Sequence, residues 1–448
     1  MSDSNDPTLA QQATSTALLT TVPTDGVPVA TDDVADDVAR VTEEFGPPKR
    51  TIALVLIAAV GMYVMAMSLG TALSLRVAGV APETKDLLYS RIVSVGALLM
   101  LVVIPVAGAL SDRTVSRFGR RRPWILGCLV VSLAAAVVVG TSANPLALGA
   151  AYVIAVVAMQ AGFNAYAVIP VEAVPDQMRA RVMGVMGLFG ALAYSAGTYL
   201  TGALVTRPLL LMTVPILLAL FTSIPLLALY RDPAKRRSEV PALDLKEMAA
   251  GFVVNPRKHP DFGWTWLARL LAGIAMAALL TYFVYFLIDG LGVPLTEVGS
   301  KAGLLTLISA PVSIIFFTGS GWLSDKIGRR KPFVAAAAVI MGAGLVIGAM
   351  SHSFAMFVVA WLVFAVGQAM YLTVDLALCA SVLPNRSDAG KDMAVFGLAL
   401  NIPNILVPAV APAILAIGGG GNYPLLWLIA AALCVLGAGI MPLIRGVR

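Results

Sequence analysis

Charged side chains are scarce in this sequence of 448 residues, where Asp, Glu, Lys and Arg together make up 12%. A soluble domain carries roughly twice that share. Hydrophobic residues make up 59%, and the mean hydropathy is +0.87. If the chain folded in water, it would have too few polar residues to cover its apolar ones. We therefore expect most of the chain to face lipid.

Cysteine and histidine are also rare. Cys128, Cys379 and Cys434 lie in apolar runs, and His259 and His352 stand alone. Their spacing fits neither a disulfide framework nor a zinc site, so we expect no metal and no other cofactor. No Walker loop and no Ser/His/Asp or Cys/His constellation stands out, which argues against a nucleotide-driven pump and an enzyme. A membrane sensor would need a larger attached domain.

Long apolar runs dominate the rest of the sequence. A helix needs about 20 apolar residues to cross a bilayer, and barrel strands would alternate and be half as long. Twelve runs qualify as spans: 51–73, 88–111, 123–141, 145–168, 183–206, 209–230, 265–289, 300–323, 332–350, 354–378, 392–416 and 423–445. The sequence therefore predicts an all-α membrane protein.

The basic residues are distributed unevenly between the loops. With the N-terminus placed in the cytoplasm, 24 of the 31 Lys and Arg residues fall in cytoplasmic segments and five fall on the opposite side. Because basic residues favour cytoplasmic loops, we expect both termini to be cytoplasmic, in a bacterial plasma membrane. The bases are spread over six loops and ends, so we expect no nucleic-acid partner.

Polar segments divide the spans into two groups of six. Residues 1–46 carry nine acids and one base, a composition typical of disorder. The expected organisation is a disordered acidic cytoplasmic tail at 1–46, a six-helix bundle at 47–230, a cytoplasmic linker at 231–261 and a second six-helix bundle at 262–448.

The two groups of spans share a repeated pattern at a spacing of about 209 residues. The first copy reads Gly108-Ala-Leu-Ser-Asp112-Arg113 and then Gly119-Arg120-Arg121-Arg122-Pro123, and the second reads Gly321-Trp-Leu-Ser-Asp325-Lys326 and then Gly328-Arg329-Arg330-Lys331-Pro332. Further along, Gln160 matches Gln368 and Pro175 matches Pro384. The agreement indicates a duplication, and two duplicated halves enclose a substrate site near the bilayer midplane in many carriers.

This pattern resembles the signature loop of the major facilitator superfamily, and it follows spans two and eight. The resemblance implies twelve helices in two six-helix repeats and a cytoplasmic gate at both copies. In the first copy, we expect Gly108 to allow close helix packing and Gly119 to allow a tight turn. Asp112 suits a bond to a helix N-terminus or to an Arg. We interpret the loop and its second copy as a latch that stabilises one conformation.

The first copy, read from Ser111 to Pro123, closely resembles the corresponding loop of sucrose transporters. These belong to the glycoside–pentoside–hexuronide:cation symporter group, so the resemblance implies uptake of a sugar or glycoside with a proton or sodium ion. The chain departs from this group in span four, where Asn164 and Ile169 occupy the positions of its Arg and Asp. The alternative is an exporter or uniporter of another small organic molecule.

Polar residues inside spans are the candidates for substrate and ion binding. Asp375 is a candidate coupling carboxylate, although pairing with a Lys or Arg is the alternative, and we expect Arg269 to extend to the inner surface. The candidate cavity residues are Gln160, Asn164, Tyr166, Gln368, Asp375, Asn401, Asn404 and Glu172. We expect a monomer in the lipid bilayer with a small-molecule substrate and a coupling proton or sodium ion.

Overall fold

The computed structural model describes residues 31–233, 259–382 and 389–444, and twelve helices within them are long and apolar enough to cross a membrane. This confirms the all-α fold, and the described residues form no strand. The first bundle consists of α3 (Pro48–Val80), α4 (Lys85–Asp112), α5 (Arg122–Thr141), α6 (Pro145–Glu172), α7 (Asp176–Ala203) and α8 (Pro208–Leu229). The second consists of α10 (Pro260–Asp289), α11 (Leu295–Ile327), α12 (Lys331–Ala349), α13 (Phe354–Val382), α14 (Ala389–Asn401) with α15 (Pro403–Leu415), and α16 (Tyr423–Ile440), which continues into the short η4 (Met441–Leu443).

Local sequence signals place the ends of these helices. Proline occupies the first turn of α3, α5, α6, α8 and α10, where its missing N–H has no helical partner to lose. The Asn144 side chain accepts hydrogen bonds from the first amides of α6. Gly328 ends α11 with a φ of +67°, a conformation that favours glycine.

Proline also interrupts the eleventh span. The helix is broken at Ile402, between α14 and α15, because Pro403 has no N–H to continue the ladder and its ring crowds the preceding turn. Pro408 and Pro412 follow within α15. Ile402 keeps helical φ and ψ angles of −56° and −42°, and its N–H still donates to the Leu398 carbonyl at 2.8 Å. The interruption is therefore local.

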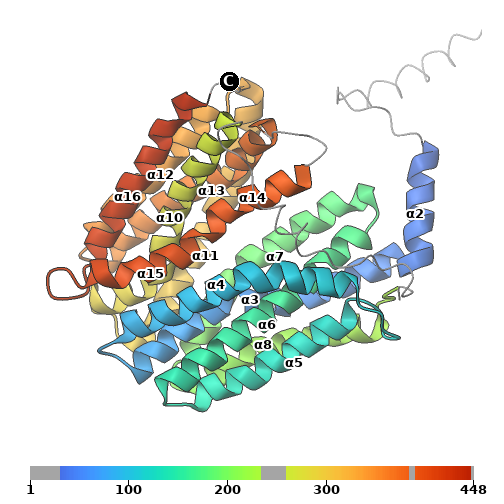
Figure 1. The fold of residues 1–448 in the computed structure, drawn as a ribbon, viewed down its shortest axis with the longest axis horizontal. Coiled ribbons are helices and arrows are strands. Elements are labelled where there is room, and N and C mark those ends of the chain that lie inside the picture. The colour runs from blue at the N-terminus through green and yellow to red at the C-terminus, as the bar shows by residue number, and fades with distance from the viewer. Residues whose placement is uncertain (1–30, 234–258, 383–388, 445–448) are drawn as a thin grey trace, which may run out of the picture.

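The two bundles lie together at one end and diverge toward the other, as Figure 1 shows. We call the end where they diverge the basic end, because it carries the Arg-rich loop 113–121. We call the other the distal end. Its loops are 81–84, 142–144, 204–207, 290–294, 350–353 and 416–422.

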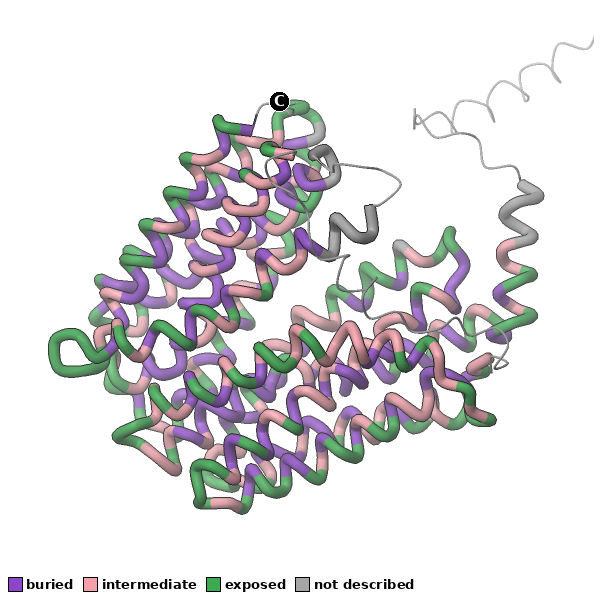
Figure 2. Tube along the Cα trace, viewed as in Figure 1, coloured by how far each residue is buried: buried purple, intermediate pink, exposed green. Residues whose placement is uncertain are grey.

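Buried residues gather inside each bundle and where the bundles meet, while exposed residues follow the outward faces (Figure 2). Many of the exposed residues are large and hydrophobic. The bundles approach most closely between α7 and α11, where the backbones of Gly202 and Gly299 are in contact. No side chain fits between them, so these glycines permit the close crossing.

Within the described residues, one helix precedes the first bundle and corrects the prediction for the tail. Residues Thr31–Phe45 form α2, so disorder through residue 46 is wrong for this part. Val38, Val41 and Phe45 recur at helical spacing, and Val41 and Phe45 are buried against the bundle. This apolar stripe stabilises the helix despite its acidic composition. The linker predicted at 231–261 lies mostly outside the described residues.

Candidate functional site

A cavity of about 500 Å³ lies between the two bundles. It is bounded by α4 and α6 of the first bundle and by α14 and α15 of the second. Three predicted residues line it together: Gln160, Asn401 and Asn404. The remaining lining is apolar apart from the buried Tyr152, which the sequence did not single out. The cavity lining therefore offers neutral hydrogen-bonding groups and no formal charge.

The break in the eleventh span positions two of these amides. Asn401 ends α14 and Asn404 lies in the first turn of α15. The Asn401 amide N–H₂ donates to the Gly397 carbonyl at 3.2 Å, and that of Asn404 donates to the Leu400 carbonyl at 3.1 Å. These bonds fix both amide groups and leave acceptor capacity on each side-chain oxygen.

Five other predicted cavity residues do not belong to this lining, and three of them are Tyr166, Asn164 and Gln368. Tyr166 is fully buried and donates to the Val55 carbonyl at 2.9 Å, so it joins α6 to α3 within the first bundle. Asn164 and Gln368 are half-buried and lie outside the cavity. The Tyr166 hydrogen bond shows that a polar residue of a span can also join helices within one bundle.

Asp375 is buried inside the second bundle and forms an ion pair with Arg269, which corrects the expectation that Arg269 reaches the inner surface. The Arg269 guanidinium also lies 4.1 Å from the ring centre of Phe396. The three residues belong to α13, α10 and α14. An unpaired charge at this depth is expensive, so the pairing stabilises both side chains. Asp375 does not line the cavity, but Phe396 precedes the cavity residue Asn401 on one helix.

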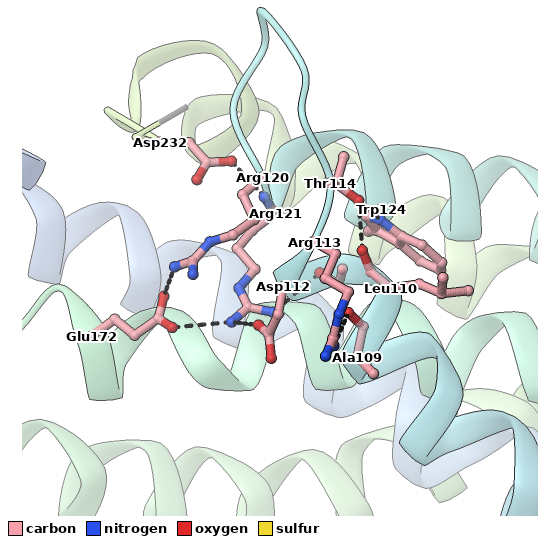
Figure 3. Close-up of polar contacts among 11 residues, drawn as sticks. Ala109, Leu110, Asp112, Arg113, Thr114, Arg120, Arg121, Trp124, Glu172 and Asp232 are labelled. Atoms are coloured by element: carbon pink, nitrogen blue, oxygen red, sulfur yellow. Dashed lines mark hydrogen bonds and ion pairs between the residues drawn. The ribbon is translucent and has the colours of Figure 1, made fainter. Parts of the chain in front are cut away.

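The first signature loop forms a charged clasp at the basic end, shown in Figure 3. One Arg121 nitrogen contacts an Asp112 oxygen at 2.5 Å and a Glu172 oxygen at 3.0 Å. Arg120 contacts the other Glu172 oxygen at 2.5 Å. Glu172, predicted in the cavity, therefore lies in the clasp instead, because it ends α6 beside the loop. The contacts join α4, α5 and α6.

Asp232, which follows α8, is a member of this clasp that sequence reasoning missed. Its Oδ2 accepts from the backbone N–H groups of Arg121 and Arg122 at 2.6 and 2.9 Å, and so caps α5 (Figure 3). Gly119 turns the chain with a φ of +93°, and its missing side chain leaves room for the Asp232 carboxylate. Arg122 also donates to the Leu227 carbonyl of α8.

The glycines at the start of the two copies behave differently. A side chain at Gly108 would meet no described atom within 4 Å, so the predicted close packing is wrong for the first copy. At Gly321 the Thr373 methyl group lies 3.0 Å from the position of a Cβ atom.

The second copy forms a different set of contacts. Arg330 donates to the Ala377 carbonyl of α13 at 2.6 Å, and Lys331 donates to the Ile444 carbonyl. Lys326 lies 4.9 Å from the Trp322 ring centre, and Arg329 is exposed. These contacts of Arg330, Lys331 and Lys326 are made to backbone carbonyls and to an aromatic ring.

A polar network at the distal end joins the two bundles, and sequence reasoning did not connect its members. Lys85 contacts Asp289 at 2.8 Å. The Tyr423 hydroxyl lies 2.7 Å from an Asp289 oxygen and 3.1 Å from an Asp86 oxygen. A further contact links Ser90 of α4 to Tyr282 of α10 at 2.6 Å. We call these residues the distal latch, because their contacts hold this end closed.

Comparison with known proteins agrees with this architecture. A model of the Major Facilitator Superfamily matches residues 41–319 and 300–448. The nucleoside transporter NupG has 12% sequence identity and a TM-score of 0.67, covering 88% of this chain and 98% of its own. A D-xylose-proton symporter has 17% sequence identity and a TM-score of 0.63, and the match covers 89% of this chain and 97% of the symporter.

A bacterial homologue of the human lysosomal transporter Spinster, in an inward-facing and occupied conformation, has 17% identity and a TM-score of 0.66, with 88% of this chain and 96% of that chain covered. At such identities the structural likeness shows the fold alone. No curated protein matches the sequence. The family match covers the repeat, the clasp and all twelve spans, and the chain therefore belongs to the major facilitator superfamily, as a multi-pass membrane transporter rather than an enzyme.

Proposed function

We propose that the chain is a symporter that takes up a neutral, hydroxyl-rich solute of the sugar or glycoside class with a proton or sodium ion. The observation that carries the proposal is the uncharged cavity between the bundles, where Gln160, Asn401 and Asn404 present amide groups. Amides both donate and accept, as hydroxyl groups require. The similar structures of a nucleoside transporter and a D-xylose-proton symporter support a solute of this kind.

The orientation follows the basic residues. We place the Arg-rich loop 113–121 and both termini in the cytoplasm of a bacterial plasma membrane, because basic loops favour that side. In this orientation the structure is closed toward the outside by the distal latch and has diverged bundles on the cytoplasmic side. The solute is then released inward from this conformation.

The Arg269–Asp375 ion pair is the proposed coupling site. A proton or sodium ion that neutralises Asp375 would release Arg269 from its partner. Arg269 packs on Phe396, five residues before Asn401 on α14. When the ion pair breaks, movement of Arg269 and Phe396 would therefore displace α14, which ends at the cavity residue Asn401 just before Pro403.

A uniporter of a neutral solute is the second candidate. It is favoured by one observation, the lack of a carboxylate in the lining of the solute cavity. A uniporter would equilibrate its solute without accumulating it, which separates the two functions experimentally.

The test is uptake of a labelled panel of mono- and disaccharides and nucleosides into proteoliposomes with imposed proton or sodium gradients. We expect accumulation against a gradient by the unaltered protein and downhill exchange only by Asp375→Asn. Glu297→Gln is the matched control, because Glu297 forms an exposed pair with Lys301 at 3.2 Å, remote from the cavity. Accumulation by Asp375→Asn would move coupling elsewhere. Uptake that never exceeds equilibrium would identify a uniporter, and no uptake of any panel member would contradict the solute class.

A further inference from the structure

We propose that an acidic phospholipid binds on the outward face of the first bundle, with its phosphate on Arg91 and an acyl chain in a groove between α4 and α6. The groove consists of two apolar depressions of about 610 and 360 Å³ that share Val153 and Ile154. Because they share these residues, they form one path along the two helices.

The groove extends along much of the bundle. On α4 it begins near Arg91 and reaches Leu110, a separation of 19 residues. At 1.5 Å per residue this is about 28 Å, close to the thickness of a bilayer core. An acyl chain of one leaflet fills about half that length. Apart from Arg91, all residues that line the groove are apolar, and Trp124 near the basic end is the one aromatic residue among them.

Arg91 supplies the headgroup contact. It is exposed, it lines the distal part of the groove, and no hydrogen bond or ion pair joins it to another residue in the described part of the chain. It lies six residues from the start of α4, about 9 Å from the helix end, where the hydrocarbon meets the headgroups. A guanidinium at this depth binds phosphate with two parallel hydrogen bonds. A lipid with net negative charge suits it better than a zwitterionic lipid, whose ammonium group opposes the attraction.

The site has a consequence for transport because α4 has two functional faces. Its outward face carries Arg91 and Val95, while Gly96 and Met100 line the solute cavity. The same helix begins with Lys85 and Asp86 of the distal latch. A lipid that holds α4 against α6 therefore acts on the helix that must move when the distal end opens.

The test is lipid retention by the purified full-length protein in detergent, measured by native mass spectrometry with dioleoyl phosphatidylglycerol or dioleoyl phosphatidylcholine. We expect phosphatidylglycerol to bind more tightly than phosphatidylcholine. Arg91→Gln should lower the affinity for phosphatidylglycerol about fivefold, because one basic residue near a membrane surface contributes about 1 kcal/mol to binding. Arg91→Lys keeps the charge and should keep most of the preference. Ala150→Trp fills the groove beside an intact Arg91 and should weaken binding of both lipids.

Arg207→Gln is the matched control, because Arg207 is an exposed arginine at the distal end outside the groove. Unchanged phosphatidylglycerol binding in Arg91→Gln, or an equal loss in Arg207→Gln, would overturn the proposal. Displacement of the lipid by millimolar inorganic phosphate would assign Arg91 to a free anion instead. Binding is measured without solute, so this test stands or fails independently of the proposed symport.

Discussion

At the scale of single residues, the amides of Asn401 and Asn404 are the sharpest test of the solute cavity. We expect Asn401→Ala and Asn404→Ala each to raise the KM of the transported solute about fivefold, because each removes one hydrogen bond worth roughly 1 kcal/mol. Gln368→Ala is the control, since this half-buried amide lies outside the cavity. Concentration-dependent uptake into proteoliposomes gives the KM. An equal rise in KM in all three variants would show that the cavity is not the solute site.

Gly119 provides a second test at this scale. Alanine at this position would adopt an unfavourable positive φ and would overlap the Asp232 carboxylate. We expect Gly119→Ala to lower the melting temperature of the purified protein by several degrees, since the cap on α5 is displaced at a cost of about 2 kcal/mol. Gly108→Ala is the control, because space is open there. A larger effect at Gly108 than at Gly119 would contradict this account of the loop.

The sequence predicts residue types better than residue neighbours. Gln160, Asn401 and Asn404 stand out in the sequence because polar side chains inside apolar runs are costly, and the structure places all three on one cavity. Glu172 was misplaced, because its partners Arg120 and Arg121 lie about 50 positions away and on another element. Asp232 was missed for the same reason, since its role as a cap depends on where α8 ends relative to α5.

At the scale of the elements, α2 is tied to the first bundle by one acid. The Asp176 backbone N–H donates to Asp37 Oδ2 at 3.0 Å, at the start of α7. This bond and the neighbouring Arg40 lower the pKa of the Asp37 carboxyl. A carboxyl with a lowered pKa stabilises the folded state above its ordinary value, about 3.8, and the contribution is lost as pH falls below it.

We expect Asp37→Asn to weaken this tie and to lower the melting temperature at neutral pH by no more than about 2 °C. Limited proteolysis within α2 should accelerate, because the helix is then held by the buried Val41 and Phe45 and by the Arg231 side chain on the Glu43 carbonyl. Glu44→Gln is the control, because no side-chain contact of Glu44 is part of the tie. The difference between Asp37→Asn and the unaltered protein should shrink as pH falls below about 3.8, and a difference that pH does not change would contradict the role of the charge.

The prediction of the elements failed where composition and periodicity disagree. Residues 31–45 are acidic enough to suggest disorder, yet Val38, Val41 and Phe45 repeat at helical spacing. Burial of that stripe decides the outcome, and burial depends on a surface that only the folded bundle supplies. The twelve spans were predictable because each is long and apolar enough to form a helix in lipid regardless of its neighbours.

At the scale of the whole molecule, the duplication predicts two bundles but not their relative position. The paired motifs at Gly108 and Gly321 indicate that the two halves are repeats of one fold. Which end is closed depends on contacts between halves, and these contacts change during transport. The distal latch therefore could not be read from the sequence, since Lys85 and Asp289 are separated by 204 positions.

The latch makes the conformational balance testable. Its contacts exist only while the distal end is closed, so removing one should shift the protein toward the distal-open state. Because Lys85 and Asp289 are largely shielded from solvent, we expect Lys85→Gln and Asp289→Asn each to increase the distal-open population about fivefold, for roughly 1 kcal/mol. Their effects should not add, because both remove the same pair.

The measurement is labelling of Ala97→Cys, a residue of the solute cavity, by an impermeant maleimide applied from the distal face. The background protein carries serine at Cys128, Cys379 and Cys434. Labelling should accelerate in both latch variants and stay unchanged in Lys301→Gln, whose lysine pairs with Glu297 on its own helix. If labelling is equally fast in all of these proteins, the network does not hold the distal end closed. If it accelerates only in the latch variants, the Lys85–Asp289 contact helps to set the balance between the two faces of the transporter.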